Sequence, residues 1–257
     1  MIQTHIDLPS LDSLRKSLDY LASSSDGIYL DTNALLPDFL YPNRNKIGSM
    51  SEVLWLLDDN MTFGSERKRI LREVSEYFSK YCDMSLRFLM ENENIFLTEP
   101  VSREIIDFYK ALNSGHRKWK RSNRWRENYG IDERFWKKYK RSLHTLVDAI
   151  DSLDQNGKIL KIRQSDYDSI FNLVSSARRY CHKDRKKGNC TDELLICYGY
   201  LGAFSHSRVV LLSDDLDIKT LLEHSFDDVV NKLANPNINL ISKYLKRLVA
   251  KETIELN

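Results

Sequence analysis

The chain has 257 residues, of which 42% are apolar and 30% are charged, and its formal net charge is +2. Nine glycines and five prolines exclude collagen-like and low-complexity chains. Four cysteines in a chain of this length do not form a disulfide scaffold, and no apolar run is long enough to cross a bilayer. The N-terminus lacks the basic start and apolar core of a signal peptide. We therefore expect a cytoplasmic protein that does not bind membranes.

The first half of the chain alternates short apolar strands with amphipathic helices. Residues 1–26 form a predicted helical extension, with apolar residues at helical spacing from Leu11 to Leu21. The compact apolar run 28–30 predicts a strand that ends at Asp31, and helical patterns follow around 50–58 and 65–90. A second strand is predicted at 95–97, and Pro100 then opens a helix that continues to Leu112.

The second half continues this alternation. Helices are predicted at 132–154, at 166–180, from Thr191 to about Phe204 and from about Leu216, and strands at 209–212 and 238–241. Strands that alternate with helices favour an α/β fold with three α/β/α layers around a mostly parallel sheet of about four to five strands. We expect one domain over residues 27–242, a helical insertion at about 113–165, and a C-terminal helix at 243–257.

Carboxylates fall repeatedly where the predicted strands end. Asp31 follows the first strand, and Asp215 and Asp217 follow the strand 209–212, while Glu104 and Asp192 lie in the first turns of helices. The carboxyl ends of parallel strands meet at one edge of a sheet, so these five acids should converge there. A favourable helix dipole explains several of them singly, but it explains neither Asp31 nor the joint pattern. Converging carboxylates repel one another unless a cation neutralises them, and oxygen ligands suit one or two Mg²⁺ or Mn²⁺ ions.

At these positions the sequence resembles the PIN-domain nucleases, a family of metal-dependent nucleases. Four motifs carry the resemblance, and they occur in this order: Ile28 to Asn33, Thr98 to Glu104, Thr191 to Leu195, and Leu211 to Ile218. It implies a PIN-like domain and an Mg²⁺- or Mn²⁺-dependent endonuclease that acts on RNA in preference to DNA. It also implies that Asp31, Glu104, Asp192 and Asp215 bind metal, with Asp217 in support, and that Asn33 and Ser213 orient carboxylates or water.

Two details of this resemblance leave alternatives open. Asp214 takes the place of Asp215 if the turn is shifted by one residue, and Glu193 is close in sequence but lies about 100° around the helix from Asp192. A haloacid-dehalogenase-like phosphatase also has an Asp after its first strand, but it needs a second Asp where this chain has Asn33. The other alternative is a PIN-like module that binds RNA or protein without cleaving it. We also allow for a protein that inhibits or activates the enzyme.

Positive charge is concentrated between His116 and Arg141. This segment holds 11 Lys and Arg against three acids, which leaves 28 basic and 34 acidic residues elsewhere. Such a segment predicts either an anionic partner or a solvated helix face. A second basic run, from Arg178 to Lys187, should overhang the acids and bind a phosphate next to the scissile one. Zinc is a minor alternative for Cys181, His182 and Cys190. The predicted nucleic-acid-binding residues are Arg117, Lys118, Trp119, Lys120, Arg121, Arg124, Trp125, Arg126, Lys183, Arg185, Lys186 and Lys187.

Overall fold

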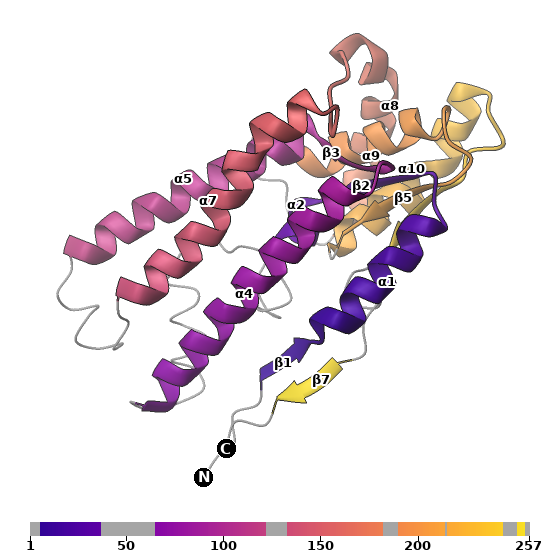
Figure 1. Cartoon of the computed structure of the whole chain (residues 1–257). Helices are drawn as coiled ribbons and strands as arrows, with labels where there is room; N and C mark the ends of the chain where they lie inside the picture. Colours follow the sequence, from indigo (N-terminus) through magenta and orange to yellow (C-terminus); the bar gives the residue numbers. More distant parts are fainter. Residues whose placement is uncertain are drawn as a thin grey trace.

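The computed structural model describes residues 6–36, 65–121, 133–181, 190–213, 215–243 and 251–254. The described part contains a five-stranded parallel sheet, a separate antiparallel strand pair, and helices on both sides of the larger sheet (Figure 1). This arrangement confirms the predicted α/β class and the three α/β/α layers. The predicted helix at 50–58 lies outside the described residues. The elements in chain order are β1 (Ile6–Pro9), α1 (Leu11–Ser23), β2 (Gly27–Leu30), α2 (Thr32–Leu35), α4 (Ser65–Glu91), β3 (Ile95–Thr98), α5 (Glu99–Arg121), α7 (Glu133–Gln155), β4 (Ile159–Leu160), α8 (Gln164–Ser176), η2 (Ala177–Tyr180), α9 (Thr191–Gly202), β5 (Val209–Leu212), α10 (Leu216–Leu233), β6 (Leu240–Lys243) and β7 (Lys251–Ile254).

The parallel sheet has the strand order β4-β3-β2-β5-β6, with β2 in the centre. All four residues of β2 and all four of β5 are buried, as expected for parallel strands that are covered on both faces. In their register Leu30 lies opposite Leu212, so β2 and β5 end at the same level. Asp31 and Ser213, which follow these two residues, are therefore brought to the same edge of the sheet.

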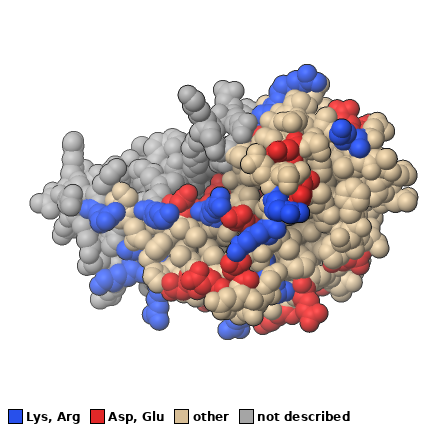
Figure 2. Space-filling model, turned by 90° about the horizontal axis from the view of Figure 1, so that it is seen from above, with Lys and Arg blue, Asp and Glu red and all other residues tan. Residues whose placement is uncertain are grey.

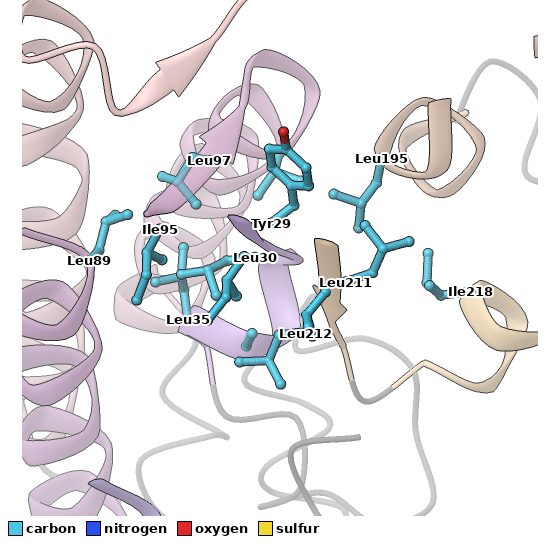
Figure 3. Close-up of a cluster of buried hydrophobic side chains, with 14 of the residues drawn as sticks. Tyr29, Leu30, Leu35, Leu89, Ile95, Leu97, Leu195, Leu211, Leu212 and Ile218 are labelled. Carbon is cyan, nitrogen blue, oxygen red and sulfur yellow. The ribbon is translucent and has the colours of Figure 1, made fainter. Parts of the chain in front are cut away.

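Helices pack on both faces of these strands. Figure 3 shows Leu195 of α9 on one side of the strands and Leu89 of α4 on the other, with Leu30 and Leu211 between them. Two glycines let α9 approach the sheet. A Cβ at Gly202 would lie 2.0 Å from the Tyr29 hydroxyl oxygen, and one at Gly199 would lie 2.8 Å from Leu211 Cδ2. The close contact with Tyr29 requires glycine at position 202.

Three long helices extend beyond the sheet. Helix α7 packs against both α4 and α5, and all three run alongside one another away from the strands (Figure 1). The predicted insertion at 113–165 is corrected by this structure, because Leu97 and Thr98 of β3 pair with Ile159 and Leu160 of β4. The sheet thus resumes at residue 159. The sequence missed β4 because two residues are too short to show a period.

The two ends of the chain meet in a small antiparallel pair, in which Ile6 of β1 pairs with Ile254 of β7. This pairing corrects two predictions: a strand precedes the N-terminal helix, and residues 251–254 form a strand instead of a C-terminal helix. The predicted N-terminal helix is present as α1, which the Ser10 side chain caps. Among the described residues, no helix combines the length and the apolar character that a membrane span needs.

Candidate active site

Asp31 is the buried centre of the predicted site. It follows β2, caps the short helix α2, and has only 4% of its surface exposed. Its Oδ1 accepts a hydrogen bond from the backbone N–H of Thr32 at 2.7 Å. Its Oδ2 accepts hydrogen bonds from Asn33 Nδ2 and from the Ser213 hydroxyl, each at 2.7 Å. These neutral donors fix the orientation of the carboxylate, and they include both residues predicted to play that role.

Glu104 lies next to Asp31 on the second turn of α5, the helix that follows β3. The Thr32 hydroxyl donates a hydrogen bond to Glu104 Oε2 at 2.5 Å. Thr32 therefore connects the two acids: its backbone binds Asp31 and its side chain binds Glu104. Thr32 could not be assigned this role from the sequence, because a hydroxyl beside a carboxylate has no spacing signature.

Asp192 and Glu193 open helix α9 and share one cation, Arg178. The guanidinium of Arg178 donates to Asp192 Oδ2 at 2.9 Å and to both Glu193 oxygens, at 3.1 Å and 2.8 Å. Glu193 is fully buried, whereas the Asp192 side chain retains 30% of its surface. The sequence separated the two by their positions around the helix, yet one guanidinium binds both. The prediction that Arg178 overhangs the acids is wrong, since its guanidinium is bound between Asp192 and Glu193. Helix α9 begins at Thr191, as predicted, and Cys190 is its N-cap.

Asp215 and Asp217 lie at the start of α10 and have different surroundings. Asp215 is the N-cap, and its Oδ1 accepts the backbone N–H of Asp217 at 2.9 Å. The Asp215 N–H in turn donates to Ser213 Oγ at 2.9 Å, so Ser213 connects Asp215 to Asp31. Asp217 is 1% exposed, and its Oδ2 lies 3.6 Å from Arg178 Nη1. Asp214, the alternative to Asp215, lies outside the described residues.

Electrostatic repulsion couples four of the five predicted acids. Burial raises the pKa of Asp31 well above its usual value, and the charges of Asp192 and Glu104 raise it further. Burial likewise raises the pKa of Asp192 to about 6; hydrogen bonds and charge from Arg178 lower it, whereas the charge of Asp215 raises it. The charges of Glu104 and Asp192 thus act on Asp31, and the charge of Asp215 acts on Asp192. A cation placed among them would relieve this repulsion.

Oxygen donors of this kind fit a hard divalent cation such as Mg²⁺ or Mn²⁺. Asp31 supports this fit, because its hydrogen-bond donors are neutral while its charged neighbours are carboxylates. Within the described ranges, however, no group of three or more His, Cys, Asp or Glu side chains is arranged to hold a metal ion as it stands. The four cysteines are free thiols, and His182 of the zinc alternative lies outside the described residues.

The predicted nucleic-acid-binding residues are only partly described. Arg117 is exposed on α5, and Lys118, Trp119, Lys120 and Arg121 continue that helix. The positions of their side chains are not described. The remaining members of the set, which lie in segments 122–132 and 182–189, fall outside the described residues.

Comparisons of the chain with protein-family models, with curated proteins and with solved structures find no match.

Proposed function

We propose that the protein is an Mg²⁺- or Mn²⁺-dependent endonuclease that hydrolyses phosphodiester bonds, with RNA favoured over DNA. The proposal rests mainly on Asp31, a buried carboxylate at the edge of a parallel sheet that is electrostatically coupled to Glu104 and Asp192. The residues that would hold the cation are Asp31, Glu104, Asp192 and Asp215. When bound there, such a cation activates a water molecule and stabilises the charge that develops on the phosphate.

Neighbouring polar groups would hold these carboxylates in place for catalysis. Ser213 bridges Asp31 and the backbone of Asp215, and Asn33 holds the same Asp31 oxygen that Ser213 binds. Thr32 ties Glu104 to the loop that carries Asp31. Such outer contacts keep ligand oxygens oriented between turnovers, and losing one typically costs 10–100-fold in metal affinity or activity.

Cations along α5 support a nucleic-acid substrate. Arg103, Lys110 and Arg117 recur every seven residues, so they lie along one face of the helix, and all three are exposed. Arg103 is adjacent to Glu104, and the row runs about 21 Å from there to the basic segment. Viewed from above, Lys and Arg side chains recur along the protruding helices, with acids between them (Figure 2).

Two of these cations already have acidic neighbours. Arg103 contacts Glu99 at 2.5 Å, and Lys110 contacts Asp107 at 2.9 Å. Both pairs lie within one helix and both cations are exposed, so the pairs are weak and leave the cations available to phosphates. We expect a single strand to run from the acids along α5 to the basic segment.

The proposal is tested by incubating the full chain with single-stranded RNA and DNA oligonucleotides of increasing length, with Mg²⁺, Mn²⁺ or EDTA. We expect metal-dependent cleavage, faster on RNA, that improves until the strand is long enough to follow α5. Replacing Arg117, Lys118, Lys120, Arg121, Arg124 and Arg126 with Ala should weaken binding and flatten its salt dependence. If the wild-type chain binds these oligonucleotides but cleaves none of them with either metal, the proposal is wrong.

A non-catalytic RNA- or protein-binding module is the second candidate function. It is favoured by Arg178, which already neutralises part of the acidic cluster. In a protein that binds no metal, an internal guanidinium such as that of Arg178 compensates the charge of buried carboxylates. The same assay separates the two candidates, since the module would bind RNA with equal affinity in EDTA and in Mn²⁺ and would leave the strand intact.

A further inference from the structure

Arg178 is the most tightly held charged side chain near the acids. It lies on the short helix η2, and only 15% of its side chain is exposed. Its Nε and Nη2 bind the two oxygens of Glu193 as a planar fork. The same Nη2 binds Asp192, and Nη1 faces Asp217 at 3.6 Å. One guanidinium thus joins three carboxylates from two different helices.

The burial of these partners makes the contacts of Arg178 costly to break. Glu193 and Asp217 expose 0% and 1% of their surfaces, and the Glu193 fork keeps its charge compensated. Removing a cation from such a site leaves buried charge uncompensated, which is strongly unfavourable. Helix η2 also packs against α10, which carries Asp217. We therefore expect Arg178 to stay with the acids and not to bind a phosphate of the substrate, as the basic run in the sequence suggested.

The contacts of Arg178 divide the acids into two groups. Glu193 and Asp217 face the guanidinium and are buried with it. Asp31 and Glu104 make their hydrogen bonds to Thr32, Asn33 and Ser213. Asp192 stands between the groups, because Arg178 binds its Oδ2 while its charge also acts on Asp31.

We propose that Arg178 takes the place of a second metal ion, so that the site binds one divalent cation per chain. This inference rests on the proposed function. Arg178 is then a positioning residue: it fixes Asp192 through one oxygen and keeps Glu193 and Asp217 away from the metal. A second divalent cation beside Asp192 would lie next to the guanidinium and be repelled by it. The sequence predicted that Asp217 supports metal binding, whereas in this proposal Asp217 is a partner of Arg178.

The test is a titration of the metal-free full chain with Mn²⁺, followed by calorimetry and by the electron paramagnetic resonance of free Mn²⁺. We expect one ion per chain in the wild type. Two ions would overturn the inference and leave the proposed function standing. The absence of any Mn²⁺ binding would overturn the proposed function and the inference with it.

Substitutions of the acids and of Arg178 itself test this role. Asp217→Asn should keep Mn²⁺ affinity within about twofold of wild type, whereas Asp31→Asn should lower it by more than the roughly 10–100-fold typical of outer contacts. Equal losses in both variants would show that Asp217 binds the metal and would refute the inference. Arg178→Gln should bind a second Mn²⁺ ion, with the exposed neighbour Arg179→Gln as control.

A purely structural Arg178 would give a different result. Arg178→Gln would then lower the melting temperature in EDTA and leave the Mn²⁺ stoichiometry at one, which would refute the inference. If Arg178→Gln does not fold, the wild-type stoichiometry and the Asp217→Asn affinity decide the question without it. Arg178→Lys keeps the charge and loses the fork, and it should retain the stoichiometry of one.

Discussion

Asp31→Asn is the substitution that most directly tests the candidate site. The change removes a charge that is 4% exposed and keeps the shape of the side chain. In the wild type both oxygens accept hydrogen bonds, Oδ1 from the Thr32 N–H and Oδ2 from Asn33 and Ser213. The NH₂ group of the new asparagine would face a hydrogen-bond donor at either of the two oxygen positions. At Oδ1 that donor is a backbone N–H, which cannot rotate, so the NH₂ should take the Oδ2 position.

The stability of the metal-free variant follows from two opposing effects. An NH₂ at the Oδ2 position faces the two donors Asn33 and Ser213, but the Ser213 hydroxyl can rotate to accept from it, so one hydrogen bond is lost. Losing one hydrogen bond to a charged group costs about 1.5–3 kcal/mol. Removing the charge relieves its burial and its repulsion by Asp192 and Glu104, the causes that hold the pKa of Asp31 well above its usual value. Because the effects offset each other, we expect the free energy of unfolding in EDTA to change by no more than about 2 kcal/mol.

The effect on cleavage should be much larger than the effect on stability. A bound cation supplies several kcal/mol of transition-state stabilisation, and each 1.36 kcal/mol corresponds to a factor of ten. A loss of about 4 kcal/mol therefore predicts a decrease in kcat of roughly 1,000-fold, with RNA affinity nearly unchanged. The assay is single-turnover cleavage of a labelled RNA in Mg²⁺ and in Mn²⁺, with urea unfolding in EDTA in parallel. The control is Asp12→Asn, an exposed acid in α1 that should cleave normally. Wild-type cleavage by Asp31→Asn would refute this site.

The fold was largely readable from the sequence because parallel strands are buried on both faces. The apolar runs 28–30, 95–97 and 209–212 each became a strand within one residue of the predicted bounds. Strand β7 was missed because three of its four residues, from Lys251 to Thr253, are polar, so it carries no apolar alternation. Its pairing with β1 depends on contacts between residues about 250 positions apart, which local patterns do not report.

The sequence predicted the site correctly only for residues whose positions are determined by the ends of strands. Asp31 and Ser213 follow two strands in register, so their meeting follows from the parallel sheet. Arg178 could not be placed, because its partners lie 14 and 15 residues away and its neighbours are also basic. One usable signal was overlooked. Helix α9 is apolar almost all round and therefore buried, so its Glu193 required a buried cation.

Three further predictions concern stability, and the last also concerns catalysis. Gly202→Ala should destabilise the protein by about 1–3 kcal/mol in urea unfolding, because its Cβ would overlap the buried ring of Tyr29, while Gly199→Ala should cost less because it meets flexible leucine side chains. The melting temperature in EDTA should rise by a few degrees between pH 7 and pH 5. The pKa of Asp192 is about 6 in the folded state, which is above its value in the unfolded state. As the pH falls through this range, the folded protein therefore takes up the proton first, and the free energy of unfolding rises by about 1 kcal/mol. Ser213→Ala should lower the free energy of unfolding by about 2–4 kcal/mol, because the buried hydroxyl donates to Asp31 and accepts from the backbone N–H of Asp215. The same variant should lower kcat about 10–100-fold in Mn²⁺, since Asp31 loses the contact that orients it. Stability and catalysis thus depend on the same hydroxyl. If Ser213→Ala is destabilised but still cleaves RNA at the wild-type rate below its melting temperature, Asp31 does not need this hydroxyl to orient it.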